Sequence, residues 1–107
     1  MNETNGTKSG SNLERVLRAG DFAVTAELGP PKNADADVIR EKAGQLRGLV
    51  DAVNITDNQT AIVRMSSVGA AVLAMQEGLE PVLQMTCRDR HRLAMQADLL
   101  GAWALGL

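Results

Sequence analysis

The sequence predicts an α/β fold built on a parallel β-sheet, and two observations support this prediction. Three segments, residues 22–30, 51–59 and 81–89, each begin as an apolar strand and end in polar residues. Each is followed by a segment whose apolar residues recur with helical spacing, a pattern typical of parallel strands joined by helices. Parallel α/β proteins collect their chemistry at the carboxyl ends of their strands. We therefore expect an active-site face at the ends of these segments.

The first unit contains a short helix, a strand and a proline turn. Residues 13–17 predict an amphipathic helix, which Asn12 caps and Gly20 stops. Apolar and polar residues alternate through residues 22–28, and Gly29-Pro30-Pro31 ends this strand because proline cannot continue a β-ladder. The apolar positions of this alternation are Phe22, Val24, Ala26 and Leu28.

The next part of the chain is predicted to be a helix, the second strand and another helix, and each helix has a candidate capping residue at its start. Asp35 or Asp37 can cap the helix that follows the first strand, and the second strand spans residues 51–56. The next helix starts near Ser66, whose hydroxyl can cap it, and ends at Gly78. The apolar positions of the two helices are Val38, Ile39, Ala43, Leu46 and Leu49, and then Val68, Ala71, Val72 and Met75.

The third unit opens at Pro81, at the first strand position, where a missing N–H costs least. Asp89 or His91 precedes the third helix. Two architectures fit the pattern: an open doubly wound sheet, or the opening arc of an eightfold barrel of roughly 250 residues. A fourth strand would be due after Leu107, since three parallel strands leave an apolar edge unpaired. The apolar positions of the third helix are Leu93, Ala97, Leu100, Trp103 and Ala104.

Composition excludes several classes of protein. With 11 Lys and Arg against 13 Asp and Glu, the net charge is -2, so nucleic acid is not expected as a partner. Cys87 is the single cysteine, which excludes an intrachain disulfide and a zinc ribbon. No signal peptide or membrane span is evident, and we expect a cytoplasmic protein. Residues 1–11 are polar and predict a disordered tail.

The first strand end offers a candidate acid. Glu27 stands where the strand gives way to the proline turn, so its carboxyl is expected at the rim of the sheet. A glutamate partly walled off from water has a raised pKa and can act as a general acid. The alternative interpretation is a solvated surface glutamate.

The other two strand ends carry hydrogen-bonding groups. Residues 56–59 suit the polar edges of a cofactor ring, or else form a capped loop. The third strand end carries Gln84, Thr86, Cys87, Arg88 and Asp89; the arginine there, Arg88, could pair with phosphate or carboxylate, or form a surface pair with Asp89. Cys87 and His91 are four residues apart, but with no third ligand nearby no metal site is predicted.

Taken together in order, the strand-end motifs resemble those of methylenetetrahydrofolate reductases, in particular the short bacterial form. The matching stretches are Val24-Thr-Ala-Glu-Leu-Gly-Pro-Pro-Lys32, Asp51-Ala-Val-Asn-Ile-Thr-Asp-Asn-Gln59, Gln84-Met-Thr-Cys-Arg-Asp-Arg90 and Leu99-Leu-Gly-Ala102. The similarity covers about residues 20–107, which correspond to the first three or so of the family's eight βα units. The resemblance therefore implies a partial (β/α)8 TIM barrel, with residues 12–107 as the N-terminal part of the barrel domain.

The resemblance also implies a reaction, namely the FAD-dependent reduction of 5,10-methylenetetrahydrofolate to 5-methyltetrahydrofolate. It implies that Glu27 is the general acid that protonates the folate nitrogen, and that Thr56 and Gln84 help to position FAD. Some family members carry histidine where this chain has Gln84, and asparagine is expected where it has His91. NAD(P)H or a reduced electron-transfer partner would supply electrons, and an oligomer is expected for the full-length protein.

The same resemblance predicts that this chain alone is inactive, because the aspartate at the family's fourth strand end would lie beyond Leu107. Two rival hypotheses follow from the sequence. One is a complete, non-catalytic α/β domain that serves binding or assembly. The other is a relict fragment that binds folate or flavin weakly without turnover.

Overall fold

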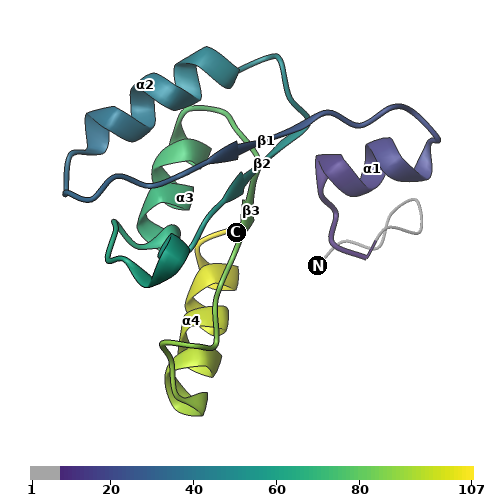
Figure 1. Ribbon diagram of the computed structural model, residues 1–107. Helices are drawn as coiled ribbons and strands as arrows, with labels where there is room; N and C mark the ends of the chain where they lie inside the picture. The colour runs from purple at the N-terminus through teal and green to yellow at the C-terminus, as the bar shows by residue number, and fades with distance from the viewer. Residues whose placement is uncertain (1–7) are drawn as a thin grey trace.

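The computed structural model describes residues 8–107, which form a three-stranded parallel sheet with helices around it (Figure 1). The strand order is β1-β2-β3, so each strand lies beside its neighbour in the sequence. This arrangement confirms the α/β fold and the parallel sheet; it is consistent with part of an eightfold barrel, and the barrel itself stays a prediction. The elements are α1 (Asn12–Arg18), β1 (Thr25–Leu28), α2 (Ala36–Leu46), β2 (Ala52–Ile55), the 3-10 turn η2 (Gln59–Ala61), α3 (Ser67–Gln76), β3 (Pro81–Leu83) and α4 (Arg92–Ala104).

The hydrophobic core lies between one face of the sheet and the helices α2 and α3. In the strand register, Leu28 pairs with Ile55 and Ile55 with Leu83, which places these apolar side chains on the same face. Small residues on α3 allow this helix to lie close to the sheet. The buried residues of the core are Leu28, Ile39, Ala43, Val53, Ile55, Ala70, Ala71, Ala74 and Leu79.

Side-chain caps fix the beginnings of α2 and α3, as predicted. The Asp35 carboxylate accepts a hydrogen bond from the N–H of Asp37, and the Ser66 hydroxyl accepts one from the N–H of Gly69. Each cap gives an otherwise unpaired N–H of the first helical turn a partner. Capping by nearby residues is a local property, so the sequence was sufficient to predict it.

Helix α1 is attached to the amino-terminal end of the sheet by the carboxylate of Glu80. This carboxylate accepts the N–H groups of Asn12 and Leu13 at 2.7 and 2.9 Å, and the Asn12 amide donates to the carbonyl of Asp51 at 3.0 Å. The predicted cap was wrong by one residue: Ser11 caps α1, because the side chain of Asn12 is engaged with the strand end.

Residues 8–11 make defined contacts, although we expected them within the tail. The N–H groups of Lys8 and Ser9 donate to the Glu14 carboxylate at 2.7–3.0 Å, which wraps this segment around the start of α1. The rest of the expected tail, residues 1–7, lies outside the described residues.

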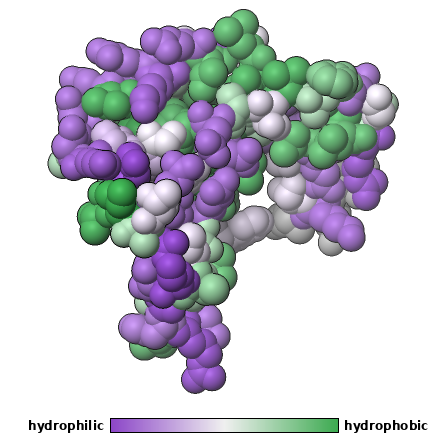
Figure 2. All heavy atoms as spheres, viewed as in Figure 1, coloured by the Kyte–Doolittle hydropathy of each residue, from purple (hydrophilic) through white to green (hydrophobic). Residues whose placement is uncertain are grey.

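Strand β1 is shorter than its alternating pattern predicted. The partner strand begins at Ala52, opposite Thr25, and the residues before Thr25 lie outside the strand pairing, although the Val24 carbonyl still accepts the N–H of Asp51 at 2.7 Å. Phe22 is 89% exposed and Val24 is 43% exposed, and the prediction that the strand begins at Phe22 was wrong. Figure 2 shows the resulting hydrophobic surface over α1 and the segment that leads into β1.

Helix α4 forms where expected but stands off from the sheet in Figure 1. Three of its apolar residues, Leu93, Leu100 and Trp103, are exposed, because no described element packs against that side of the helix. Its buried residue is Ala102. Across residues 8–107, no helix has both the length and the apolar character needed to cross a membrane.

Candidate functional site

The face of the sheet opposite α2 and α3 is open and carries the three residues that the sequence singled out. Glu27 pairs in register with Asn54, and Asn54 pairs with Val82. The ladder continues one step further, where the N–H of Thr56 donates to the Leu28 carbonyl and that of Gln84 donates to the Ile55 carbonyl. Because side chains alternate along a strand, Thr56 and Gln84 belong to the face of Glu27. We call this surface the open face.

Glu27 and Gln84 are both exposed on the open face. Within residues 8–107, the Glu27 carboxylate has no hydrogen bond or ion pair, so the partial burial that we expected is not supplied by these residues. Gln84 is held through its backbone, since the hydroxyl of Ser67 at the start of α3 donates to its carbonyl at 2.9 Å. Its amide group remains available at the surface.

Thr56 is the buried member of the set, with 1% of its surface exposed. Its hydroxyl oxygen has no hydrogen-bond partner among the described residues. Gly29 lies beside it: a first side-chain carbon at Gly29 would stand 3.7 Å from Thr56 Oγ1 and 3.8 Å from Gln59 Oε1, which are ordinary contact distances. A buried hydroxyl without a partner costs about 1–3 kcal/mol, so a polar ligand atom at this point would be favourable.

The loop after β2 has an unusual backbone. Asn58, Thr60 and Ala61 have φ values of 46°, 57° and 59°, in the left-handed region that residues with a side chain rarely adopt. The side-chain oxygen of Asn58 accepts the N–H of Arg64 at 2.9 Å and so braces the loop. Backbone strain of this kind is found preferentially at functional sites.

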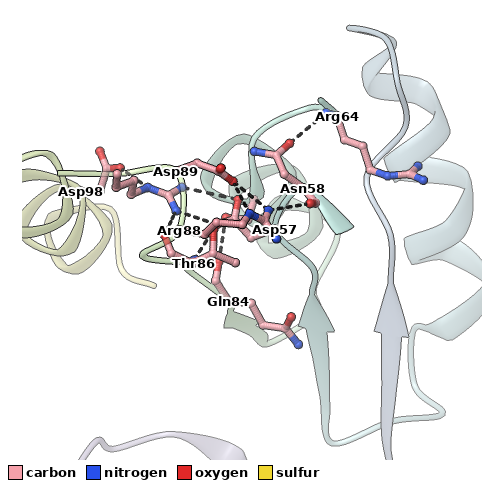
Figure 3. A network of polar contacts seen from close by, with 10 residues as sticks. Asp57, Asn58, Arg64, Gln84, Thr86, Arg88, Asp89 and Asp98 are labelled. Atoms are coloured by element: carbon pink, nitrogen blue, oxygen red, sulfur yellow. Dashed lines mark hydrogen bonds and ion pairs between the residues drawn. The ribbon is translucent and has the colours of Figure 1, made fainter. Parts of the chain in front are cut away.

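The loops after β2 and β3 are joined by a buried ion pair between Asp57 and Arg90 (Figure 3). Asp57 Oδ2 accepts the N–H of Thr86 at 2.7 Å, the hydroxyl of Thr86 at 3.1 Å and Arg90 Nη1 at 2.6 Å. Arg90 also donates to the carbonyl of Thr86 at 2.7 Å and to Asp98 on α4 at 3.0 Å. We call these four residues the Asp57–Arg90 bridge.

Electrostatics favour the charged form of both partners in the bridge. Burial alone would raise the pKa of Asp57, but the hydrogen bonds from Arg90 and Thr86 outweigh it and lower the pKa below its usual value. The pKa of Arg90 is raised, chiefly by its hydrogen bond to Asp57. The Asp57 carboxylate is therefore engaged by Thr86 and Arg90.

The remaining polar residues of the loop after β3 have structural roles. Arg88 pairs with Asp89 at 2.7 Å on the surface and donates to the carbonyl of Asn58, as the surface-pair interpretation predicted. His91 caps α4, with Nδ1 accepting the N–H of Ala94 at 3.2 Å. In the part of the chain that the structure describes, no three His, Cys, Asp or Glu side chains cluster in a way that could hold a metal ion.

Sequence reasoning missed the Asp57–Arg90 bridge. Asp57 was interpreted as a possible ring contact and Arg88 as a possible anion ligand, and Arg90 was given no role. A signal was available, since Asp57 and Arg90 lie just past the ends of adjacent parallel strands, and such ends meet at one edge of a sheet.

Comparisons with known proteins agree with this geometry. A family model described as methylenetetrahydrofolate reductase matches residues 12–107, whereas comparisons with curated proteins and with solved structures gave no significant match. The matched range spans every helix and strand described above and confirms the resemblance seen in the strand-end motifs. The chain belongs to the methylenetetrahydrofolate reductase family, whose members act in folate reduction.

Proposed function

We propose that this chain takes part in the flavin-dependent reduction of 5,10-methylenetetrahydrofolate to 5-methyltetrahydrofolate. The observation that carries the proposal is the open face, where Glu27, Thr56 and Gln84 lie on adjacent strands on the same side of the sheet. Membership of the family points to folate as the substrate class. The open face supplies a proton donor and two hydrogen-bonding groups for the chemistry.

The residues present fit FAD as the cofactor. The buried Thr56 hydroxyl lacks a partner, and a flavin ring edge carries both N–H and carbonyl groups that could supply one. Gln84 offers an amide that can donate and accept on the same face, in the position where some family members carry histidine. When bound, FAD supplies the hydride that reduces the one-carbon unit.

Glu27 is proposed to hold the proton that the substrate needs. Its carboxyl group would protonate the folate nitrogen, which breaks the ring C–N bond and leaves an iminium carbon ready to accept a hydride. General-acid catalysis near neutral pH requires a carboxyl that keeps its proton, and shielding from water promotes this. Because Glu27 is exposed in residues 8–107, substrate or further polypeptide must cover it during the reaction.

The same observation supports the proposal that the 107-residue chain is inactive by itself. No described element closes over the open face, so water has access to Glu27. We further propose a cytoplasmic protein that is oligomeric at full length and draws electrons from NAD(P)H or from a reduced electron-transfer partner. These assignments follow from the family's chemistry.

The decisive variant is Glu27→Gln in the native protein, because it removes the proton donor with little change in size. We expect folate reduction to be lost while FAD binding and flavin reduction by the electron donor stay at wild-type levels. Glu41→Gln is the matched control, since Glu41 is an exposed glutamate on α2, away from the open face. Folate turnover at the wild-type rate in Glu27→Gln would show that Glu27 is not the acid.

A second candidate function, a non-catalytic binding or assembly domain, is favoured by the exposed apolar side chains of α4. Leu93, Leu100 and Trp103 are 60–75% exposed, a pattern typical of helices that pack against another surface. The two functions differ in one measurable respect. Formation of 5-methyltetrahydrofolate by the native protein supports the enzyme, and its absence in the presence of FAD and a reductant supports the assembly domain.

A further inference from the structure

We propose that Asp57 and Arg90 are positioning residues, which hold Thr56 and Gln84 in a fixed relation on the open face. The inference rests on the proposed function, because Thr56 and Gln84 matter as a pair only if one ligand contacts both. Neither Asp57 nor Arg90 was assigned a role by the motifs that indicate the family.

The first step of the argument is the connection between the two loops. The last backbone hydrogen bond between β2 and β3 joins the N–H of Gln84 to the Ile55 carbonyl at 3.1 Å. Beyond this hydrogen bond, the two strands are connected through a side chain: the Asp57 carboxylate accepts two hydrogen bonds from Thr86. Since Asp57 follows Thr56 directly and Thr86 is two residues from Gln84, this link fixes the spacing of the two site residues.

The second step concerns Arg90, which lies in the loop after β3 and hydrogen-bonds within that loop to Thr86. Its guanidinium donates to Asp57, to the carbonyl of Thr86 and to Asp98, and so joins the end of β2, the end of β3 and helix α4. A planar guanidinium has donors in a rigid fork, so one side chain can hold three acceptors at fixed angles. Lysine, a single flexible ammonium, would hold the same acceptors less tightly.

The third step is that the bridge faces away from the ligand. The Asp57 side chain is 1% exposed and that of Arg90 is 15% exposed, and the hydrogen bonds of both go to protein atoms. In Figure 3 the side chain of Gln84 points away from Asp57 and Thr86. These residues therefore act through Thr56 and Gln84 and do not touch the ligand themselves.

The third loop also contains a matched control. Arg88 forms an ion pair with Asp89 in the same loop and donates to the carbonyl of Asn58, but both side chains of the pair are 47% exposed, and Arg88 forms no hydrogen bond with Asp57. Arg88→Gln and Arg90→Gln therefore remove the same charge from neighbouring positions. Only the second change breaks the bridge.

The first test is amide hydrogen exchange, which needs no ligand. In Arg90→Gln we expect exchange at the N–H groups of Thr56 and Gln84 to rise by at least about tenfold, while that of Val53 in the core changes less than about twofold. Arg88→Gln removes only the exposed contacts to Asp89 and to the Asn58 carbonyl and should change all three rates by less than about twofold, and Arg90→Lys should be intermediate. An equal rise at all three sites would mean general destabilisation, and no rise at Thr56 and Gln84 would mean no positioning; either result overturns the inference.

The second test is FAD titration of the native protein, followed by quenching of flavin fluorescence at a temperature where every variant is folded. We expect Arg90→Gln to weaken FAD binding by about tenfold and Arg88→Gln by less than about twofold. Equal affinity of wild type and Arg90→Gln for FAD would overturn the inference. If the wild type does not bind FAD, the proposed cofactor is wrong, and the exchange rates alone decide whether Asp57 and Arg90 position the two residues.

Discussion

Thr56→Val is expected to stabilise the ligand-free protein, although it removes a polar group from a candidate active site. Thr56 is 1% exposed and its hydroxyl has no partner among residues 8–107. Valine has nearly the same shape, so no large cavity is created. Leaving a buried hydroxyl unpaired costs about 1–3 kcal/mol, and removing it should therefore raise the free energy of unfolding by about 1 kcal/mol or more.

The assay is urea unfolding of the purified chain, followed by far-ultraviolet circular dichroism. A change in midpoint at constant slope reports a change in stability, whereas a change in slope would indicate a different denatured state. For a domain of this size, a gain of 1 kcal/mol corresponds to a rise in Tm of roughly 4–8 °C. Thr56→Ser is the control, because it keeps the hydroxyl and removes a buried methyl group, and it should destabilise by about 1 kcal/mol.

The sign of the change in stability in Thr56→Val decides whether the Thr56 hydroxyl is unpaired in the ligand-free protein. If valine lowers the free energy of unfolding at constant slope, the hydroxyl is already paired in the ligand-free protein, and the reasoning about Thr56 fails. The FAD proposal predicts the opposite sign for binding, since a ligand that contacts the hydroxyl loses that contact in Thr56→Val. A variant that is more stable and binds FAD less tightly would satisfy both expectations.

Two further predictions concern the helix ends. Replacing His91 by alanine removes the acceptor for the Ala94 N–H and should lower the free energy of unfolding, measured by urea titration, by about 1 kcal/mol. The control, His91→Asn, keeps a capping acceptor and should keep the wild-type stability. Equal stability of the two variants would contradict the role of His91 as a cap. At α1, the hydrogen bonds from the backbone of Lys8 and Ser9 lower the pKa of Glu14 from 4.5 to about 2. Because the folded pKa is the lower one, this stabilisation is present above about pH 4.5 and is lost as the pH falls towards about 2. The titration of the Glu14 carboxyl carbon by NMR should have its midpoint near 2, and a midpoint near 4.5 would show that the segment before α1 does not hold this carboxylate.

The features that the sequence predicted well are those decided by neighbours along the chain. Asp35 and Ser66 cap helices whose first turns follow them directly, so their side chains need no distant partner. The three strands were found from short apolar runs that end at turn residues. The parallel pairing of the strands then followed from the helices between them.

The features that the sequence could not predict depend on residues far apart. Phe22 continues the alternation of β1, but its exposure is decided by the residue at which β2 begins, some thirty positions later. The Asp57–Arg90 pair spans 33 residues, and one sequence offers three arginines at positions 88, 90 and 92 as equal candidates. Only the placement of the two loops selects Arg90.

The two uncovered surfaces of this chain differ in chemistry, and the difference bears on how Glu27 could act. The exposed side of α4 is apolar, at Leu93, Leu100 and Trp103, and removing these side chains from water would be favourable. The open face carries Glu27 and Gln84, which water solvates well. A general acid near neutral pH must be shielded from water, so the residue types at the strand ends do not by themselves make an acid. We therefore expect the activity to depend on what covers the open face, and Glu27 to donate a proton only when a bound flavin, a folate or further polypeptide excludes water from it.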